Sequence, residues 1–456
     1  MLKKILIANR GEIAIRIMRT CREMGVDAVA VYSTADRDAL HVQLASEAIC
    51  IGGPRPADSY LKYKNILTAA LQTGCDAIHP GYGFLSEQAD FAELCQQAGL
   101  VFIGPEPETI RLLGDKSKAR ELAQKAGIPV VPGSIGALEN VRQAITIAAE
   151  IGYPVLLKAS AGGGGRGMRF VNSEDELANA YGEARQEALV AFGQDELYLE
   201  KLIRQPKHVE VQILADHAGR VVHLGERECS LQRKRQKLIE ESPANIPDDL
   251  RKQLTTAAVK LGEASGYLGA GTVEFIVDSD NNFYFIEVNT RIQVEHPVSE
   301  WRSGIDLIRE QIRIAGGAEL NFAQEAIHLT GHAIECRLNA ENPRESFRPA
   351  PGKIEQFVLP GGLGVRLDTA IYPGYEVSPW YDSMLGKLIV YGKNRSEAIR
   401  RLRRCLEETI IEGVESNLGL LYVLLFEPEF IRGDYHTEFV EANLERLLNF
   451  PDLMER

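Results

Sequence analysis

The stretch from residue 283 to residue 295 carries acidic, amide and basic side chains at every second position. Read as one strand with a period of two, it predicts an apolar core face made of Tyr284, Ile286, Val288, Ile292 and Val294. The opposite face then carries Glu287, Asn289, Arg291, Gln293 and Glu295. Solvated strand faces favour Thr, Lys and Ser, so this row of metal-type and anion-type ligands predicts a functional site.

A further carboxylate, Glu274, lies upstream in a predicted strand over 271–275. Glu287 and Asn289 stand two positions apart on one strand, so their oxygens are expected on the same side. Two carboxylates and an amide oxygen suit Mg²⁺, which keeps several waters and bridges phosphates. The sequence therefore predicts a magnesium site at these three residues.

A glycine-rich segment, residues 161–167, follows Lys158 at the end of a predicted strand over 154–158. Glycines lack Cβ atoms, so their backbone N–H groups can approach phosphate oxygens closely. No Gly-Lys-Ser/Thr follows, so the segment is not a P-loop. A phosphate-binding loop and a flexible hairpin fit the glycines equally well, and Lys158 and Lys116 are candidate phosphate ligands.

Four cations fall within residues 232–237, in the sequence QRKRQK. A nucleic-acid patch is disfavoured by the acidic chain and by the lack of interleaved aromatic residues. Plain solvated charge remains open, and a local anion-binding cluster is favoured. A second basic run, residues 400–404, lies on a predicted amphipathic helix with acidic residues just after it, which favours a solvent-exposed face.

Three isolated features also carry chemistry. His208, Glu210 and Gln212 alternate on a predicted strand, where a metal site and a set of acceptors for a nucleotide's ribose and base fit equally well. Arg337 lies in an otherwise apolar strand, and a buried arginine needs a partner or a ligand. Cys229 is interpreted as a core residue, because nothing suggests an activated thiolate.

The first hundred residues alternate between predicted strands and helices, which favours a doubly wound parallel sheet. Ligands of such sheets bind beyond the carboxyl ends of the strands. Those ends carry residues 9–11 (NRG) and 79–83 (HPGYG), and no GxGxxG follows the first strand. The predicted strands are 5–8, 28–32, 77–79 and 101–103, and the predicted helices are 12–24 and 87–98, with another around Ile66.

After residue 115 the chain divides into segments that differ in their predicted secondary structure. Residues 116 to about 203 hold helices, including 117–126, a Pro/Gly break and the glycine-rich segment. Strands dominate from 208 to about 325, and a mixed segment with a Pro/Gly-rich stretch at 348–374 follows. At roughly 150 residues per domain, the 456 residues suggest about three domains.

Composition excludes several classes. Hydrophobic residues make up 45% and charged residues 25%, an ordinary globular mix. Lys plus Arg is 51 and Asp plus Glu is 64, so the net charge is −13, which disfavours nucleic acid and anionic membrane as partners. Seven cysteines without a CxxC pair, no signal peptide and no membrane-length apolar run predict a soluble, cytoplasmic protein.

Six motifs together make the sequence recognisable. They are KKILIANRGE (3–12), HPGYGFLSE (79–87), GDK (114–116), KASAGGGGRGM (158–168), EVNTRIQVEHP (287–297) and YDSM (381–384). From end to end the chain resembles biotin carboxylase, the ATP-grasp subunit of acetyl-CoA carboxylase and its relatives. The resemblance implies a mixed α/β and α+β fold. Its expected parts are an N-terminal Rossmann-like domain (1–115), an ATP-grasp small subdomain (116–203), an ATP-grasp large subdomain (204–330) and a C-terminal mixed domain (331–456).

The resemblance also implies a role for each matching residue. ATP is expected at Lys116, Lys158, Gly164, Gly165, Glu200, Lys201, Leu202, Ile203, His208, Arg235, Glu274 and Glu287. Two ions of Mg²⁺ or Mn²⁺ are expected at Glu274, Glu287 and Asn289, and bicarbonate at Lys237, Arg291, Gln293, Val294 and Glu295. Glu295 is the expected general base, catalysis is assigned to Arg291, Glu295, Arg337 and Lys237, and biotin is expected at Tyr82, Arg291, Val294 and Arg337.

One departure and one absence qualify the resemblance. Arg235 stands where many relatives have His near the ribose, and the chain lacks the Ala/Val-Met-Lys-Met motif that carries biotin. Biotin is therefore expected on a separate carrier protein, with carboxyltransferase subunits as further partners. A homodimer is also implied, with contacts at Arg16, Arg19, Glu23 and Arg366.

The expected activity is the first half-reaction of acetyl-CoA carboxylase, in fatty-acid synthesis. The same half-reaction in a pyruvate, propionyl-CoA or 2-oxoglutarate carboxylase fits the sequence equally well. A non-catalytic ATP-binding regulator is disfavoured, because such a protein needs only the nucleotide site and not Glu295, Arg291 and Arg337.

Overall fold

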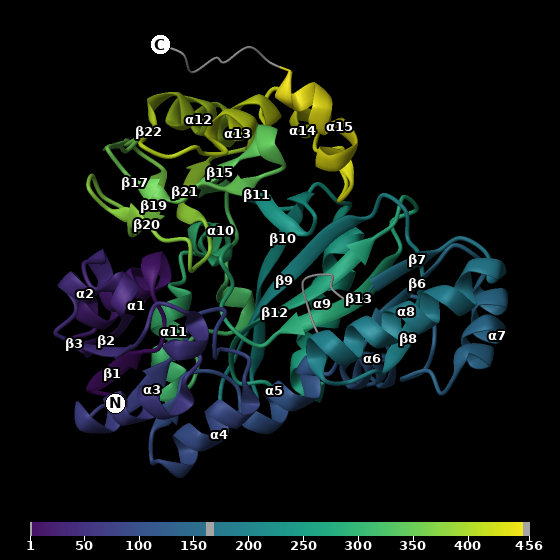
Figure 1. The fold of residues 1–456 in the computed structure, drawn as a ribbon, viewed down its shortest axis with the longest axis horizontal. Coiled ribbons are helices and arrows are strands. Elements are labelled where there is room, and N and C mark those ends of the chain that lie inside the picture. Colours follow the sequence, from purple (N-terminus) through teal and green to yellow (C-terminus); the bar gives the residue numbers. More distant parts are fainter. Residues whose placement is uncertain (1, 161–167, 450–456) are drawn as a thin grey trace.

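A five-stranded parallel sheet forms the N-terminal part of the computed structural model, which describes residues 2–160 and 168–449. Its order is β3-β2-β1-β4-β5, as expected for a doubly wound sheet (Figure 1). Alternate residues of β1 pack into two different cores, because successive side chains of a strand point to opposite faces. The strands are β1 (Lys4–Ile7), β2 (Asp27–Ser33), β3 (Glu47–Gly52), β4 (Ala77–His79) and β5 (Val101–Phe102).

Helices flank this sheet, and the loops after β1 and β4 meet at its carboxyl edge. The Asn9 side chain donates hydrogen bonds of 2.7 Å to the carbonyl oxygens of Pro80 and Tyr82, so it fixes the loop after β4. The edge strand β3 was not expected from the sequence, since it is mostly half-exposed and lacks a clear apolar pattern. The helices are α1 (Gly11–Glu23), α2 (Leu40–Leu44), α3 (Tyr63–Gln72), α4 (Ala89–Gln97), α5 (Pro107–Gly114) and α6 (Lys116–Lys125).

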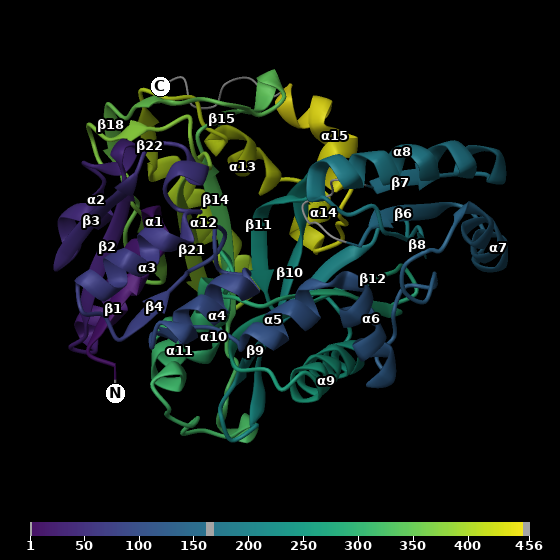
Figure 2. The same ribbon diagram turned by 60° about the horizontal axis from the view of Figure 1, so that its bottom comes forward.

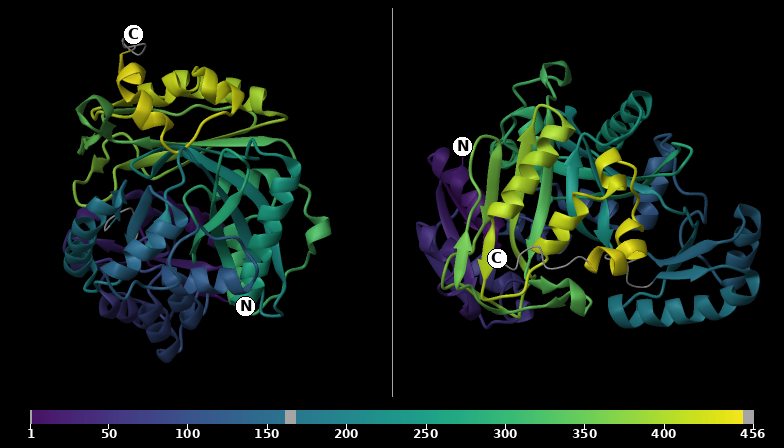
Figure 3. Two further views of the ribbon diagram at one scale, coloured as in Figure 1. Left: turned by 90° about the vertical axis from the view of Figure 1, so that its right-hand side faces the viewer. Right: turned by 90° about the horizontal axis from the view of Figure 1, so that it is seen from above.

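A small antiparallel sheet of three strands, in the order β7-β6-β8, projects from the rest of the molecule (Figures 1 and 3). Two helices pack on it and bury a separate apolar cluster that includes Leu157, Leu177 and Leu199. The glycine-rich segment 161–167, with Gly164 and Gly165, lies outside the described residues. The elements are α7 (Val141–Ile151), β6 (Val155–Ala159), β7 (Met168–Val171), α8 (Glu174–Phe192) and β8 (Leu197–Lys201).

One eight-stranded antiparallel sheet, in the order β13-β12-β9-β10-β11-β14-β21-β19, runs through the remainder of the molecule (Figure 2). It crosses residue 330, because β11 pairs directly with β14. The strands are β9 (Lys207–Ala215), β10 (Val221–Arg233), β11 (Gln236–Ser242), β12 (Gly269–Val277), β13 (Phe283–Asn289), β14 (His332–Asn339), β19 (Val365–Thr369) and β21 (Met384–Gly392). The helices α9 (Asp248–Ala264), α10 (His296–Ser303) and α11 (Leu307–Ala315) complete this part.

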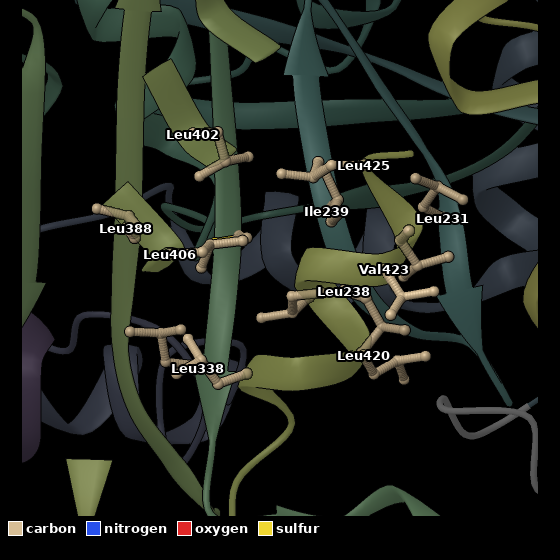
Figure 4. Close-up of a cluster of buried hydrophobic side chains, with 14 of the residues drawn as sticks. Leu231, Leu238, Ile239, Leu338, Leu388, Leu402, Leu406, Leu420, Val423 and Leu425 are labelled. Atoms are coloured by element: carbon tan, nitrogen blue, oxygen red, sulfur yellow. The ribbon is translucent and has the colours of Figure 1, made fainter. Parts of the chain in front are cut away.

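The C-terminal helices cover one face of this sheet with an apolar cluster (Figure 4). Leu402 and Leu406 of α12 (Arg395–Glu408) pack against Leu388 of β21, while Arg404 pairs with Glu408 on the outside. This confirms the predicted amphipathic helix. The remaining elements are β15 (Glu341–Asn342), β16 (Arg348–Pro349), β17 (Gly352–Lys353), β18 (Gln356–Val358), β20 (Glu376–Val377), β22 (Ile410–Glu412), α13 (Leu418–Leu424), α14 (Pro428–Arg432) and α15 (Phe439–Leu448). Among the described residues, no helix has the length and apolar character needed to cross a membrane.

The prediction of one regular strand from 283 to 295 is wrong. The strand β13 ends at Asn289, and a register shift against β12 leaves Ile286 as an extra residue. Such a β-bulge exchanges the two faces of a strand. Phe283 and Phe285 therefore face the core in place of Tyr284 and Ile286, while Glu287 still faces the site.

Candidate functional site

A second β-bulge, in β11, helps to build the site. Leu231 pairs with Ile239 and Gln232 pairs with Lys237, so Leu238 has no partner in β10. The extra residue turns Lys237 and Glu240, three positions apart, toward the same side of the sheet. A regular strand would place them on opposite faces.

Lys237 lies mostly buried among carboxylates from three parts of the chain. Its Nζ donates a hydrogen bond of 2.7 Å to Glu210 of β9 and another to Glu295, and it lies 3.6 Å from Glu274 of β12. Burial would lower the pKa of Lys237, but the surrounding negative charge holds it well above its usual range. The ammonium group is therefore charged and sits at the centre of an acidic cluster.

Glu295 directly precedes α10, and cations surround its carboxylate. Lys237 binds one oxygen, and Nη2 of Arg337 donates to the other at 3.0 Å. Burial alone would raise the pKa of Glu295, but these two cations and the nearby Arg227 hold it well below its usual range. The group is therefore ionised at neutral pH, which is the form that a proton acceptor needs.

Arg227 of β10 was not singled out from the sequence. It is fully buried, and its guanidinium donates to Glu210 at 2.6 Å and to Gln293 at 2.6 Å. It also donates to Gln212 at 2.7 Å, and to Thr272 and Ser299 at 3.0 Å. This arginine fixes the side-chain amides of Gln212 and Gln293 and the Glu210 carboxylate. Its position inside a long strand is the sequence feature that could have identified it as a buried arginine.

Arg337 of β14 has the partner that a buried arginine requires. Its Nε donates to Glu240 of β11 at 2.6 Å, while Nη2 reaches Glu295. Burial would lower the pKa of Arg337, but the neighbouring carboxylates raise it above its usual value. Arg337 therefore bridges two carboxylates.

A second buried cation lies next to this bridge. Lys387 of β21, which pairs with Arg337 across the sheet, donates to the Val294 carbonyl at 2.8 Å and lies 3.2 Å from Glu12. Glu12 in turn accepts a hydrogen bond from the Tyr82 hydroxyl. The chain Tyr82–Glu12–Lys387–Val294 thus ties the N-terminal loop to the Glu295 segment. Lys387 and Glu12 were not recognised as site residues in the sequence.

The predicted metal ligands do come together. Glu274 and Glu287 are direct cross-strand partners, and the Asn289 amide donates to Glu274 at 2.7 Å. Lys116 lies 2.9 Å from Glu287, and His208 lies 3.1 Å from Glu274. Burial would raise the pKa of Glu274, but Lys237 and His208 hold it below its usual range. His208, Glu210 and Glu274 also lie within metal-ligand spacing of one another, so the alternatives for His208 stay open.

Arg291 binds the N-terminal part of the chain. Its Nε donates to Glu87 at 2.9 Å, and its Nη2 donates to the Asn289 side chain at 3.1 Å. Burial would lower the pKa of Arg291, but Glu87 raises it. Glu87 closes the HPGYGFLSE motif, so this contact explains how that motif positions the arginine.

Part of the expected nucleotide set lies on or just after β6 and β8. Glu200 binds Lys158, and it accepts a bond of 3.0 Å from Arg120 of α6. The Lys201 side chain instead donates to the carbonyl oxygens of Gly152 and Tyr153, at 2.9 and 3.0 Å. Leu202 and Ile203 follow directly after β8.

The basic run 232–237 does not act as one cluster. Of its four cations, only Lys237 lies among the site carboxylates. The Arg233 guanidinium stacks 4.1 Å above the Phe347 ring, and Lys234 forms the hairpin turn with φ +45°. Arg235 is next in the turn and contacts the Met168 sulfur of β7.

Three of the four residues expected in a dimer contact form ion pairs within the chain. Arg16 and Arg366 both bind Glu300 of α10, at 2.8 and 2.7 Å. Glu23 lies 3.5 Å from Arg309, and Arg19 is exposed. Cys229, expected in the core, is fully buried, and burial raises its thiol pKa well above the usual value.

Three family models match the chain. Residues 1–110 match the biotin carboxylase N-terminal domain, residues 115–323 match the ATP-binding domain of the carbamoyl-phosphate synthase L chain, and residues 335–442 match the biotin carboxylase C-terminal domain. The chain is 55% identical to biotin carboxylase 1 of Bacillus subtilis, across 97% of this chain and 99% of that protein. It is 51% identical to a pyruvate carboxylase subunit of Methanothermobacter thermautotrophicus, across 97% of this chain and 90% of that protein.

Solved structures agree with these matches. A β-γ-ATP complex of biotin carboxylase from Campylobacter jejuni has a TM-score of 0.95 and 49% identity, covering 97% of this chain and 99% of that one. The biotin carboxylase domain dimer of Hydrogenobacter thermophilus 2-oxoglutarate carboxylase was solved with MgADP, ADP and bicarbonate. It has a TM-score of 0.96 and 47% identity, covering 99% of this chain and 100% of that one.

Proposed function

The chain belongs to the biotin carboxylase family of ATP-dependent ligases, with the ATP-grasp fold, and on this premise we propose how its residues share the reaction. Bicarbonate attacks the γ-phosphorus of ATP to give carboxyphosphate and ADP. Carboxyphosphate then releases CO₂ and phosphate, and the ureido nitrogen of biotin takes up the CO₂ as its proton leaves. We assign one set of residues to bicarbonate and another to biotin. The observation that supports this assignment most strongly is that Glu295 is held between Lys237 on one side and Arg337 on the other.

The bicarbonate side comprises Lys237, Arg291, Gln293, Val294 and Glu295. Glu295 is ionised and takes the bicarbonate proton. An anion bound beside Lys237 and Arg291 offsets part of the positive charge that these residues place near Glu295. Its binding therefore raises the pKa of Glu295 and makes Glu295 a better proton acceptor. The planar guanidinium of Arg291 grips a flat anion with two parallel hydrogen bonds, which lysine cannot do.

The nucleotide side is proposed to comprise Lys116, Lys158, Gly164, Gly165, Glu200, Lys201, Leu202, Ile203, His208, Arg235, Glu274 and Glu287. The ammonium of Lys116 and the imidazole of His208 already lie against the Glu287 and Glu274 carboxylates, so this cluster accepts positive charge. Two hard oxygen donors and the Asn289 amide fit Mg²⁺ or Mn²⁺. A bound ion there would offset charge on the transferring phosphoryl group.

The biotin side is proposed to comprise Tyr82, Arg291, Val294 and Arg337. Arg337 donates to the ureido oxygen, where negative charge develops when the ureido proton leaves. Phosphate released in the previous step takes that proton. The Tyr82–Glu12–Lys387 chain keeps Val294 in place beside it.

The wider assignment is part of the same proposal. We assign the domains to 1–115, 116–203, 204–330 and 331–456. The family models support the boundaries near 115 and 330, while one model spans both ATP-grasp subdomains. Biotin arrives on a carrier protein that also serves carboxyltransferase subunits. Acetyl-CoA is the favoured acceptor because the motifs resemble the biotin carboxylase subunit of acetyl-CoA carboxylase. Pyruvate or 2-oxoglutarate remains a second candidate acceptor, because parts of those carboxylases match almost as well.

A homodimer in the cytoplasm completes the proposal. The dimer of the 2-oxoglutarate carboxylase domain supports it. We assign the contact to Arg16, Arg19, Glu23 and Arg366, as the family resemblance implies. All seven cysteines are free thiols, which agrees with a reducing compartment.

The testing experiment measures ADP release with and without bicarbonate, and with and without free biotin. ADP release that requires bicarbonate and rises with biotin supports the proposal. Nucleotide binding without bicarbonate-dependent turnover would instead favour a non-catalytic ATP-binding protein. A Glu241→Gln variant is a matched control, because Glu241 neighbours Glu240 but contacts none of the proposed substrate residues.

A further inference from the structure

A buried carboxyl group, Glu335, lies beside the Arg337 bridge and has no role in the reaction described above. Glu335 stands two positions before Arg337 in β14, so both side chains point to the same face of the sheet. Across the ladder it pairs directly with Glu240 of β11, the residue that holds Arg337. Side chains paired in this way have Cβ atoms about 4.5–5.5 Å apart.

Two buried carboxyl groups therefore face each other with oxygens to spare. Glu335 is fully buried, and among the described residues no donor reaches either of its oxygens. Glu240 uses Oε1 for Arg337, and its Oε2 is likewise buried without a donor in the described part of the chain. A charged carboxylate without hydrogen bonds is very costly in the interior, which favours a proton on one of the pair.

The charged groups around Glu335 come from every neighbouring element. They are Glu240 on β11, Arg337 on β14, Lys387 on β21 and Glu295 before α10. Lys387 is already engaged by Glu12 and the Val294 carbonyl, and Asp368 of β19 lies 3.9 Å from it. Asp368 in turn pairs with Arg366, which lies across the ladder from Ile389. Val298, Ala333 and Ile389 are the apolar residues of this face. Burial raises the pKa of Glu335 well above its usual range, Lys387 opposes this and Glu240 adds to it. Burial also raises the pKa of Glu240, to about 7, against the effect of Arg337.

We propose that Glu335 is a neutral positioning residue for biotin carboxylation: its protonated carboxyl donates to the free Oε2 of Glu240 and so holds Glu240 with its other oxygen on Arg337. Arg337 then stays aligned for the ureido oxygen, whereas Glu295 is also held by Lys237 and depends less on this alignment. No proton leaves Glu335 during the cycle. This inference rests on the proposed role of Arg337 and adds the residue that orients its partner.

Two substitutions test whether Glu335 acts as a hydrogen-bond donor or only fills space in the core. Glu335→Gln keeps an N–H donor at the same length, so biotin carboxylation should stay within about twofold of the wild type. Glu335→Leu keeps the volume but removes the donor, so biotin carboxylation should fall about fivefold to tenfold, as for one lost buried hydrogen bond. Bicarbonate-dependent ADP release without biotin should change by less than about twofold in both variants. Glu335→Met replaces Glu335→Leu if the latter does not fold, because methionine adapts to irregular space.

Infrared difference spectroscopy tests the proton itself, without any turnover. The wild type at neutral pH should show the carbonyl band of a protonated carboxylic acid, and Glu335→Gln should lack it. Absence of that band, or a Glu335→Gln variant as slow as Glu335→Leu, would overturn the proposal, and so would full activity of Glu335→Leu. If the band is present in a wild type that does not carboxylate biotin at all, the proposed function fails while the protonated state of Glu335 stands.

Discussion

On one face of β11 the Glu240 carboxyl accepts a hydrogen bond from Arg337, and burial raises its pKa to about 7 against the effect of Arg337 and Lys237. On the other face its neighbour Glu241 meets Arg395, His332 and the Tyr435 hydroxyl. Burial would raise the pKa of Glu241, but these partners hold it far below its usual range. Both residues are buried in one strand, so the number of donors, and not burial, decides their charge.

The comparison extends across the whole sheet. On the face beneath α12 and α14, Arg395, His332 and Tyr435 bind Glu241, and leucines fill the space around it. The face beneath α10 leaves polar atoms free, including Oε2 of Glu240 and both oxygens of Glu335. Unpaired buried polar groups are expected where a substrate is to bind or charge is to develop. Because Lys237, Glu295 and Arg337 also meet on the face beneath α10, we place the reaction there.

The largest effect is expected at Glu295, which both half-steps share. Glu295→Gln cannot accept the bicarbonate proton, so both ADP release and biotin carboxylation should fall by about 10²–10⁴. Glu241→Gln on the other face should keep both rates within about twofold. Steady-state rates of the two variants check this, and equal losses would break the comparison between the faces.

A smaller effect is expected at the metal ligands. Glu287→Gln removes one of the charged oxygens beside Glu274, so activity at ordinary Mg²⁺ should fall roughly 10–100-fold and recover in part at high Mg²⁺. A Mg²⁺ titration at saturating ATP measures the shift, and circular dichroism controls for folding. Near-native activity without a shift would place the metal elsewhere.

A pH effect should separate the two half-steps. Glu240 holds Arg337 as a carboxylate, and its pKa is raised to about 7, so biotin carboxylation should fall about tenfold per pH unit below 7. Glu295 has a lowered pKa and stays ionised, so bicarbonate-dependent ADP release should lack this limb. Glu240→Gln should flatten the limb, whereas an identical limb in both wild-type rates would count against the assignment.

The smallest expected change concerns stability on the far face. The folded pKa of Glu241 lies below its unfolded value of about 4.3, so its contribution is complete above that value and is lost as the pH falls toward the folded pKa. Glu241→Gln should lower the free energy of unfolding at pH 7 by about 1–3 kcal/mol. Urea unfolding at pH 7 and at pH 3 measures this, and the difference between the two proteins should shrink at pH 3.

Much of this arrangement could be predicted from the sequence, because apolar periodicity and motifs are local. The parallel N-terminal sheet, the amphipathic α12 and the grouping of Glu274, Glu287 and Asn289 were accessible in this way. The bulges at Ile286 and Leu238 were not, since an extra residue reverses a face without leaving a mark in the pattern.

Hydrogen-bond and ion-pair partners that are far apart in the chain could not be predicted from the sequence either. Arg227 binds side chains up to 72 positions away, and Glu87 reaches Arg291 across 204 positions. Nothing in the spacing of the sequence encodes such distances. The Lys387–Glu12 pair was missed for the same reason, because its members lie at opposite ends of the chain.

One measurement tests most directly whether the bicarbonate and biotin sides are separate. It determines the rates of biotin carboxylation and of bicarbonate-dependent ADP release for Arg337→Gln on one preparation, each relative to the wild type. Arg337 is proposed to donate to the ureido oxygen when charge develops there, so biotin carboxylation should fall by about 10²–10³. Glu295 keeps Lys237 as a second cation when Arg337 is replaced. Bicarbonate-dependent ADP release without biotin should fall much less, with unchanged Mg²⁺ dependence. If both rates fall by the same factor, Arg337 belongs to the bicarbonate site and the proposed separation of the two sides is wrong.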